Sequence, residues 1–253
     1  MKTFVLAAIC AVIIFSMPIT VSAQSGVSPK KVLEALAGRE FKHALDLAGK
    51  VDEPNYSDKS GVTLLMYAAE TGAADVCRVL LERGADHSLR TANGTTALYL
   101  AAQNGHTGVV RTLLEKGADP DIRPDNGATP LIAASEYGHT DVAALLVEKG
   151  ADASLQDNHG STALILASQN GNEEIVRILL GKGIDPDIQD LNGSTALILA
   201  AQEGQTEIAR MLLQSGADVN RQTLNGNSAL ILASLKGNME TVQMLLDSGA
   251  PVD

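Results

Sequence analysis

Five aspartates that recur along this sequence are the residues best suited to chemistry. They stand 33 positions apart, at Asp86, Asp119, Asp152, Asp185 and Asp218. A row of carboxylates could bind a divalent cation, because oxygen atoms are the ligands that calcium prefers. Each aspartate, however, closes a Gly-Ala-Asp or Gly-Ile-Asp triplet that belongs to a longer repeat. We therefore expect these carboxylates to hydrogen-bond the loop backbone, and we predict no calcium site.

The histidines and cysteines form no recognised metal-binding or catalytic pattern. The sequence lacks both His-Glu-x-x-His and Cys-x-x-Cys, and its five histidines are scattered. Cys77 occupies a position that other repeats fill with valine, so we expect a buried apolar thiol. The glycines are spaced to end helices and not to cradle a phosphate group. We therefore predict no catalytic residue, no metal site and no cofactor.

The elements that must position any site are short helices, whose ends are marked by regularly spaced glycines. A turn glycine, a glycine after a first apolar run and a glycine after a second run each recur six times, in steps of 33. The three series run from Gly61 to Gly226, from Gly72 to Gly237 and from Gly84 to Gly249. Helices this short are not stable alone in water. They must bury their apolar faces against neighbouring copies, which predicts an elongated repeat stack.

Equivalent residues are expected to start the helices and to fill the core in every repeat. A hydroxyl at the start of each first helix can accept a hydrogen bond from a helix N–H group that would otherwise lack a partner. These residues are Thr63, Thr96, Thr129, Thr162, Thr195 and Ser228. Two rows of leucines are predicted to be buried, one from Leu65 to Leu230 and the other from Leu80 to Leu245. Acid–arginine pairs such as Asp75 and Arg78 should cover the outer face.

Three stretches of the repeat carry a family resemblance. They are Thr129-Pro130-Leu131, Gly105-His106-Thr107-Gly108-Val109-Val110 and the segment from Leu113 to Asp119. In these motifs the sequence resembles the ankyrin repeat family over about residues 58–253. The resemblance implies an all-α fold, an ankyrin solenoid of helix-turn-helix units with hairpin tips. It also implies a structural role between repeats for His106 and His139.

One departure from the family concerns the histidine of its first-helix motif, which is absent from all six repeats. The residues in its place are apolar or aromatic, so we expect stacking to depend more on packing than in the family. They are Met66, Tyr99, Ile132, Ile165, Ile198 and Ile231.

The chain is predicted to fall into three parts. Residues 1–23 are predicted to be a signal peptide, and residues 24–57 a leader followed by an N-terminal helical capping unit. The capping unit has helical spacing of its apolar residues and a polar outer face, as the end of a repeat stack requires. Residues 58–253 form six repeats, which span 58–90, 91–123, 124–156, 157–189, 190–222 and 223–253.

The signal peptide prediction depends on Lys2, the apolar run from Phe4 to Phe15 and the small residues up to Ala23, after which we place the cut. The run is short for a membrane anchor, and Ile9 is too bulky for a lipidation motif at Cys10. Cleavage removes one lysine and no acidic residue, so the formal net charge changes from −11 to −12. A chain this acidic should be repelled by nucleic acid and by anionic membranes.

Partner binding is the function that the resemblance implies, because the family binds proteins through its hairpin tips and its concave face. Tyrosine and arginine are frequent interface anchors, so Arg90, Arg123 and Tyr137 are the strongest candidates. The full set of candidate positions is Arg90, Asn93, Gln103, Asn104, Arg123, Asp125, Glu136, Tyr137, His159, Gln169, Asn170, Gln202 and Glu203.

The predicted function is therefore that of a non-enzymatic protein-binding module, exported to the bacterial periplasm and monomeric. The alternative is a secreted effector or toxin-neutralising protein that acts outside the producing cell. An enzyme is disfavoured, since the repeats leave no room for an appended catalytic domain. Self-association through the C-terminal repeat, near Met244, is a further hypothesis.

Overall fold

The computed structural model describes residues 26–252, so the predicted signal peptide lies outside the described residues. Within them the chain forms seven successive pairs of α-helices. The first helices of the pairs are α2 (Pro29–Ala37), α4 (Leu64–Glu70), α6 (Ala97–Gln103), α8 (Pro130–Tyr137), α10 (Ala163–Gln169), α12 (Ala196–Glu203) and α14 (Ala229–Lys236). The second helices are α3 (Phe41–Ala48), α5 (Ala74–Glu82), α7 (Thr107–Glu115), α9 (Thr140–Glu148), α11 (Glu173–Gly181), α13 (Thr206–Gln214) and α15 (Met239–Asp247).

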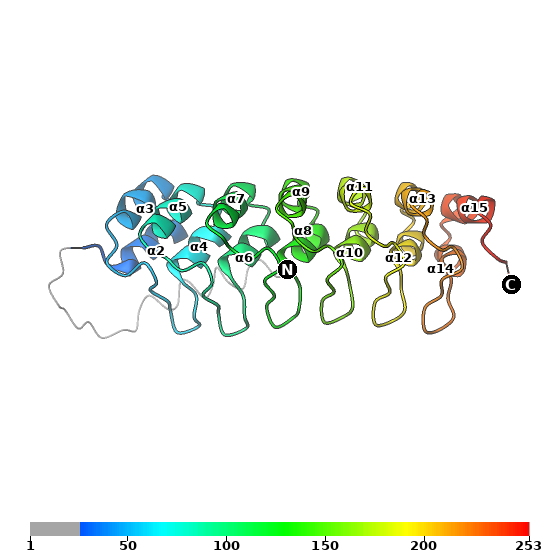
Figure 1. Ribbon diagram of the computed structural model, residues 1–253, viewed down its shortest axis with the longest axis horizontal. Helices are drawn as coiled ribbons and strands as arrows, with labels where there is room; N and C mark the ends of the chain where they lie inside the picture. The colour runs from blue at the N-terminus through cyan, green and yellow to red at the C-terminus, as the bar shows by residue number, and fades with distance from the viewer. Residues whose placement is uncertain (1–25, 253) are drawn as a thin grey trace.

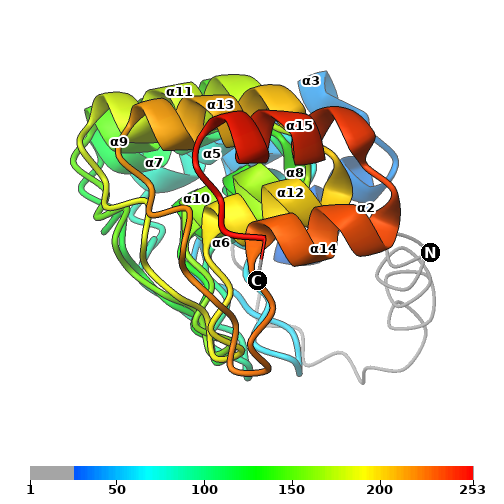
Figure 2. The ribbon, with the colours of Figure 1, turned by 90° about the vertical axis from the view of Figure 1, so that its right-hand side faces the viewer.

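The pairs stack side by side into an elongated solenoid (Figure 1). First helices pack on first helices of the neighbouring pairs, and second helices on second helices, so the molecule has two helical layers. The connections between pairs project away from the helical layers as a row of hairpins, which the end-on view shows overlying one another (Figure 2). The predicted all-α repeat solenoid is therefore confirmed.

The predicted caps start the first helices of all six repeats. Each threonine or serine hydroxyl accepts a hydrogen bond from the backbone N–H three residues later, at 3.2–3.3 Å. Such a bond stabilises a helix by about 1 kcal/mol, which matters for helices of seven or eight residues. The hydroxyl series in the sequence thus fixes where each helix begins.

The core is a continuous strip and not a single centre. In the row from Leu65 to Leu230 every leucine is at most 8% exposed, and in the row from Leu80 to Leu245 every leucine is fully buried. Cys77 lies in this strip, and burial raises the pKa of its thiol to about 12. The thiol is therefore neutral and apolar in character, as its position among valines predicted.

The hairpins are joined to one another by backbone hydrogen bonds along the stack. An N–H group of each hairpin donates to a carbonyl of the preceding one at 2.8–3.3 Å, as Leu191 N does to His159 O. This close approach needs glycine: a Cβ on Gly160 would lie 2.7 Å from the Leu191 nitrogen, and Gly160 has a φ of +77°. The tip asparagines do not share this conformation, since Arg39 is the one non-glycine residue with positive φ in the described range.

Polar side chains link successive first helices at their C-terminal ends. His106 Nε2 lies 2.9 Å from Glu70 O, and His139 Nε2 lies 3.0 Å from Gln103 O. Asn172 makes the equivalent bond one repeat later, where its side-chain amide donates to the backbone of the preceding repeat. The structural role expected for the two histidines is therefore confirmed.

The two ends of the described stack differ in how they are covered. The α2–α3 pair packs on α4 and α5 and closes the N-terminal end. At the other end no further repeat follows within residues 26–252, so Ile231 is 40% exposed where the equivalent Ile198 is 1% exposed. Met244 is itself buried, and self-association through the C-terminal repeat stays a hypothesis. Thr241 is buried too, and its hydroxyl lies 2.7 Å from that of Thr206.

Candidate functional site

The aspartate row has the structural role that the repeat predicted. Asp86 Oδ1 accepts a hydrogen bond from Ser88 N at 2.8 Å, and Asp152 Oδ1 accepts one from Ser154 N at 2.9 Å. The serine hydroxyls and backbone N–H groups together lower the pKa of both carboxyls. Across residues 26–252 no three histidine, cysteine or acidic side chains come close enough to hold a metal ion.

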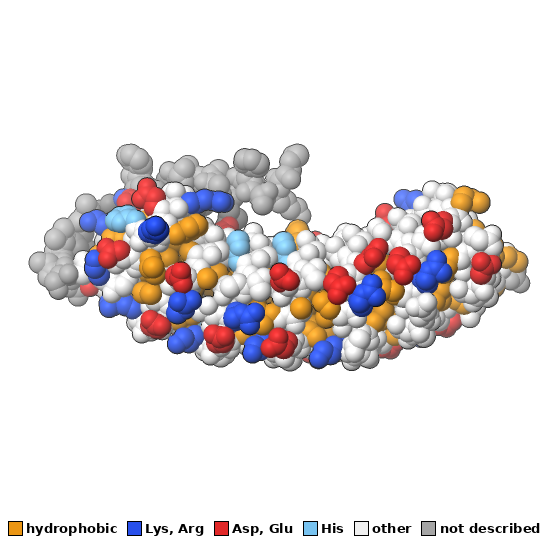
Figure 3. All heavy atoms as spheres, turned by 90° about the horizontal axis from the view of Figure 1, so that it is seen from above, with side chains coloured by type: hydrophobic (Ala, Val, Ile, Leu, Met, Phe, Trp, Pro, Cys, Tyr) orange, Lys and Arg blue, Asp and Glu red, His pale blue; other side chains and the backbone are white. Residues whose placement is uncertain are grey.

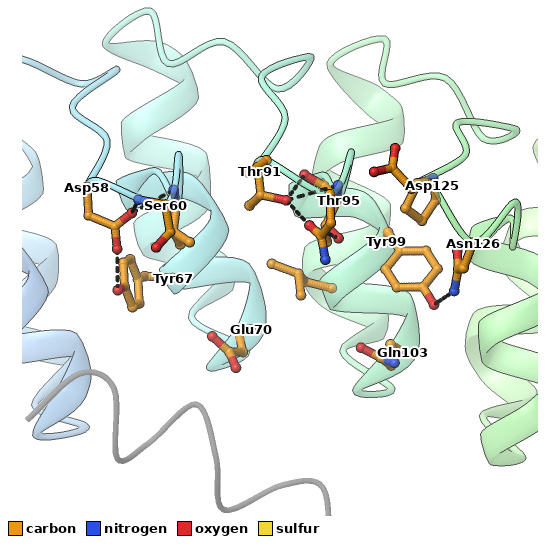
Figure 4. Close-up of a pocket in the computed structure, with 15 residues that line it drawn as sticks. Asp58, Ser60, Tyr67, Glu70, Thr91, Thr95, Tyr99, Gln103, Asp125 and Asn126 are labelled. Carbon is orange, nitrogen blue, oxygen red and sulfur yellow. Dashed lines mark hydrogen bonds between the residues drawn. The ribbon is translucent and has the colours of Figure 1, made fainter.

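A groove on the inner side of the solenoid is the candidate site. It has a volume of about 670 Å³ and lies between the hairpins of repeats 1–3 and the first helices of repeats 1 and 2 (Figure 4). Repeats 1 and 2 supply both hairpin and helix residues, and repeat 3 supplies the hairpin that closes the groove. The lining residues are Asp58, Ser60, Val62, Tyr67, Glu70, Thr91, Ala92, Asn93, Thr95, Tyr99, Leu100, Gln103, Pro124, Asp125 and Asn126.

The hairpin side of the groove is held by side-chain hydrogen bonds. Asp58 Oδ1 accepts from the N–H groups of Ser60 and Val62, and its Oδ2 accepts from the Tyr67 hydroxyl at 3.1 Å. One repeat later, Asn93 Oδ1 accepts from the hydroxyl of Thr95 at 3.0 Å. The Asp58–Tyr67 bond fixes the hairpin of repeat 1 against α4, and the Asn93–Thr95 bond holds the hairpin of repeat 2 in shape, so the groove is preformed.

The helix side of the groove carries groups whose burial perturbs their titration. Glu70 stands at the end of α4 and is half-buried, and burial raises the pKa of its carboxyl above the ordinary value. Burial also raises the pKa of the Tyr99 hydroxyl, although the hydrogen bond from Asn126 acts to lower it. A carboxylate that is partly desolvated in this way gains from a cation placed beside it.

Three of the candidate residues predicted from the sequence come together in this groove. Asn93 and Asp125 are exposed on its hairpin side, and Gln103 lies half-buried at the end of α6 (Figure 4). The ten others lie outside the groove lining. They are Arg90, Asn104, Arg123, Glu136, Tyr137, His159, Gln169, Asn170, Gln202 and Glu203.

The two arginines bond neighbouring hairpins. Arg90 Nη1 donates to Arg123 O at 2.9 Å. Arg123 Nε donates to Gly127 O at 2.8 Å, and its Nη2 donates to Gln156 O. Gln156 continues the row with bonds to carbonyls of its own hairpin and the next one. The structure therefore gives both guanidinium groups a role in stacking, and their role as partner anchors stays a prediction.

The remaining candidate residues are spread along repeats 2–5. Asn104 and Asn170 donate side-chain hydrogen bonds to backbone carbonyls, and Gln202 donates to Glu203. Tyr137 is half exposed and stacks on His139, with ring centroids 6.3 Å apart. These residues share a side of the solenoid without forming one site.

Tyr67 is a groove residue that was not predicted from the sequence, and Tyr99 was expected only to pack between repeats. Tyr67 stands where four later repeats have leucine, at positions 100, 166, 199 and 232. Tyr99 stands where the last four repeats have isoleucine. An aromatic hydroxyl in an otherwise aliphatic column was the signal that could have located the groove.

The second helices form the opposite side of the described solenoid. Acidic and basic side chains are interspersed over the face that the second helices form (Figure 3). Several make short-range ion pairs, for example Asp75 with Arg78 and Glu174 with Arg177, as predicted. Pairs this exposed contribute little to stability. No helix within residues 26–252 has the length and apolar composition to cross a membrane.

Comparison with known proteins extends over the whole stack. The profile described as ankyrin repeats (3 copies) matches residues 21–124, 119–190 and 183–253. The crystal structure of the human ASB11 ankyrin repeat domain is similar to this chain, with a TM-score of 0.78 and 27% sequence identity. That match covers 88% of this chain and 99% of the other chain. The curated proteins compared give no match.

Proposed function

The chain belongs to the ankyrin repeat family, and on that premise we propose that it is a non-enzymatic module that binds a protein partner in its inner groove. Ankyrin repeats are generally protein interaction modules. The observation that carries the proposal is the preformed groove of about 670 Å³, which three successive repeats build together.

The composition of the groove suits a protein surface. Val62, Leu100 and the Tyr67 and Tyr99 rings offer apolar and aromatic area, and tyrosine is among the residues that contribute most to binding energy. The amides of Asn93 and Gln103 can donate and accept hydrogen bonds along a partner backbone. The groove thus combines an apolar floor with polar edges, the usual arrangement of an interface.

Photo-crosslinking from inside living cells tests this site without knowledge of the partner. A photoreactive phenylalanine analogue is placed at Ala92, an exposed hairpin residue that lines the groove. The matched control carries the analogue at Leu191, the equivalent hairpin position three repeats later, which is 68% exposed. We expect a discrete protein adduct from position 92 and a much weaker one from position 191.

Each outcome of the crosslinking bears on the proposal. Adducts from position 191 alone would move the binding site away from the groove. No protein adduct from either position, with both variants folded and expressed, would contradict partner binding.

Export to the periplasm is the second element of the proposal. It is supported by the charged first residues, the apolar run and the small residues before position 24, all of which lie outside the described residues. N-terminal sequencing of the purified protein should then begin at Gln24. A protein that retains Met1 would contradict export.

The secreted alternative shares the same binding site and differs only in location. Fractionation of producing cells separates the two cases, because a periplasmic protein is released by osmotic shock. Recovery of the protein in the culture medium alone would favour an effector or toxin-neutralising protein that acts outside the cell.

A further inference from the structure

The groove carries charges of a single sign. Among its lining residues are three acids, Asp58, Glu70 and Asp125, and no lysine or arginine. The Asp58 carboxylate is engaged by two backbone N–H groups and by the Tyr67 hydroxyl. The carboxylates of Glu70 and Asp125 have no hydrogen-bond or ion-pair partner among residues 26–252. Two of the three acids are therefore free to meet a cation.

The two free carboxylates lie on opposite sides of an apolar floor. Figure 4 shows Glu70 at the end of α4 and Asp125 beside the hairpin of repeat 3. Val62 and Leu100 also line the groove, together with the rings of the two tyrosines. A ligand that fills the groove must therefore cover apolar surface and reach a carboxylate at one side or the other.

Small ions and polyanions do not match this arrangement. No group of three ligating side chains suited to a metal ion occurs in the described part of the chain. Nucleic acid and anionic lipid would meet the acids with charge of the same sign. A basic side chain carried on a protein segment satisfies the acids, while the neighbouring residues of that segment cover the floor.

Building on the function proposed above, we propose that the groove selects an extended protein segment in which a lysine or arginine stands next to an apolar side chain. The basic group pairs with Glu70 or Asp125, and the apolar side chain packs between Tyr67 and Tyr99. The amides of Asn93 and Gln103 bond the backbone of the segment. The charge of the acids selects the basic segment, and apolar contact with the floor of the groove contributes the rest of the binding.

An unbiased peptide selection tests this inference. Phage-displayed random dodecapeptides are selected on the full purified protein, and enriched sequences are measured as fluorescein-labelled peptides by anisotropy. We expect enrichment of a basic residue adjacent to an apolar one. The double variant Glu70→Gln with Asp125→Asn should weaken the binding of these peptides roughly three- to tenfold, as expected for two partly exposed ion pairs.

A control variant separates the groove from the overall negative charge of the protein. Glu82→Gln with Glu115→Gln removes two exposed acids of the second helices, so the net charge changes by the same amount. Its affinity for the selected peptides should match that of the unchanged protein. An equal loss in both variants would overturn the inference, because attraction would then be non-specific.

The remaining outcomes distinguish this inference from the function on which it depends. Enriched peptides that are acidic or uncharged, and that lose affinity on Tyr99→Ile, would overturn the preference for basic residues and leave the groove as a binding site. A selection that yields no peptide sensitive to any groove substitution would overturn both.

Discussion

Repeats 1–3 and repeats 4–6 share one core and differ in the surface that faces the hairpins. The first helices of repeats 4–6 begin with the same five residues, Ala-Leu-Ile-Leu-Ala, at 163–167, 196–200 and 229–233. Those of repeats 1–3 begin Leu-Leu-Met-Tyr-Ala, Ala-Leu-Tyr-Leu-Ala and Pro-Leu-Ile-Ala-Ala. The groove lies where the sequence departs from uniformity. The comparison teaches that packing fixes the shared residues, whereas the divergent ones are free to serve binding.

The difference has a simple physical origin. The second residue of the five is leucine in all six repeats and is at most 8% exposed, because it faces the core. The fourth residue is only partly buried where it is Tyr67 or Leu100, and both of these line the groove. A side chain that packs against the core on one side only can change without loss of the fold. In repeat 1 this position holds Tyr67, whose hydroxyl reaches the groove.

The largest predicted effect tests whether the core is common to both regions. Leu98→Ala in repeat 2 and Leu164→Ala in repeat 4 each truncate a side chain that is 1% exposed. We expect each to lower the free energy of unfolding by about 2–5 kcal/mol, since both leave a cavity in the same row. Urea denaturation followed by circular dichroism measures both. A small loss in one region alone would show that the two cores are not equivalent.

The hairpin glycines should differ in a measurable way according to how closely the next hairpin approaches them. A Cβ on Gly160 would meet the Leu191 nitrogen at 2.7 Å, whereas a Cβ on Gly94 would lie 3.0 Å from the flexible Asp125 carboxylate and 3.2 Å from the nearest backbone atoms. Gly226 has the same positive φ with no atom within 4 Å. We predict that Gly226→Ala costs about 1–2 kcal/mol for its backbone conformation alone.

Gly160→Ala should cost more than Gly94→Ala, and Gly94→Ala more than Gly226→Ala, because adjacent hairpins must move apart. Thermal unfolding of the three variants gives the order. Equal losses at all three positions would mean that hairpin contacts contribute nothing to stacking.

The row of hairpin bonds should contribute equally in both regions. Arg123 in repeat 2 and Gln189 in repeat 4 each donate to a carbonyl of the next hairpin and to one four residues ahead. We expect Arg123→Ala and Gln189→Ala each to lower stability by about 1 kcal/mol. Denaturation measures this loss. A loss for Arg123 much larger than for Gln189 would show that its charge, and not the row, is what matters.

The same arginines also allow the interface prediction to be tested. Arg90→Ala with Arg123→Ala is predicted to weaken partner binding while the chain stays folded. Unchanged affinity for the crosslinked partner would remove both residues from the interface and leave them with the structural role that their hydrogen bonds indicate.

The smallest predicted effect concerns Glu70. Its folded pKa is raised by burial, so ionisation is less favourable in the folded chain than in the unfolded one. The charge therefore reduces stability at pH values above the raised pKa and has no effect below the unfolded pKa. Glu70→Gln should stabilise the protein at neutral pH by less than about 1 kcal/mol, since part of the carboxylate remains in solvent.

Denaturation at neutral and acidic pH checks the sign. The stabilisation should vanish as the pH falls below the pKa of an unfolded glutamate. A glutamine variant that is less stable at neutral pH would mean that the carboxylate makes a favourable contact within the fold.

Most of the fold could be predicted from the sequence, because the residues that determine helix starts, helix ends and the core recur in every repeat. The glycines, the capping hydroxyls and the leucine rows each predicted a feature that the structure contains. The groove could not be predicted in the same way. Glu70 and Asp125 are far apart in sequence, and only the stacking of repeats at a definite spacing brings them to one groove.

The hydrogen bonds of Arg90 and Arg123 could not be predicted from the sequence for a related reason. Their partners are backbone carbonyls, which every residue carries, so the residue types do not indicate which carbonyl accepts the bond. Conversely, Asp58 gave no signal of a site, because an aspartate before a turn glycine normally bonds the turn, and Asp58 does so as well as facing the groove.

The central claim, that binding belongs to the divergent residues of repeats 1–3, has a direct test. The triple variant Tyr67→Leu, Glu70→Gln and Tyr99→Ile makes these positions match the uniform repeats, and it gives α6 the same sequence as residues 196–202. Anisotropy with the peptides enriched in the selection should show at least about a tenfold loss of affinity, while thermal unfolding stays close to that of the unchanged protein. Full affinity in a folded triple variant would contradict the account.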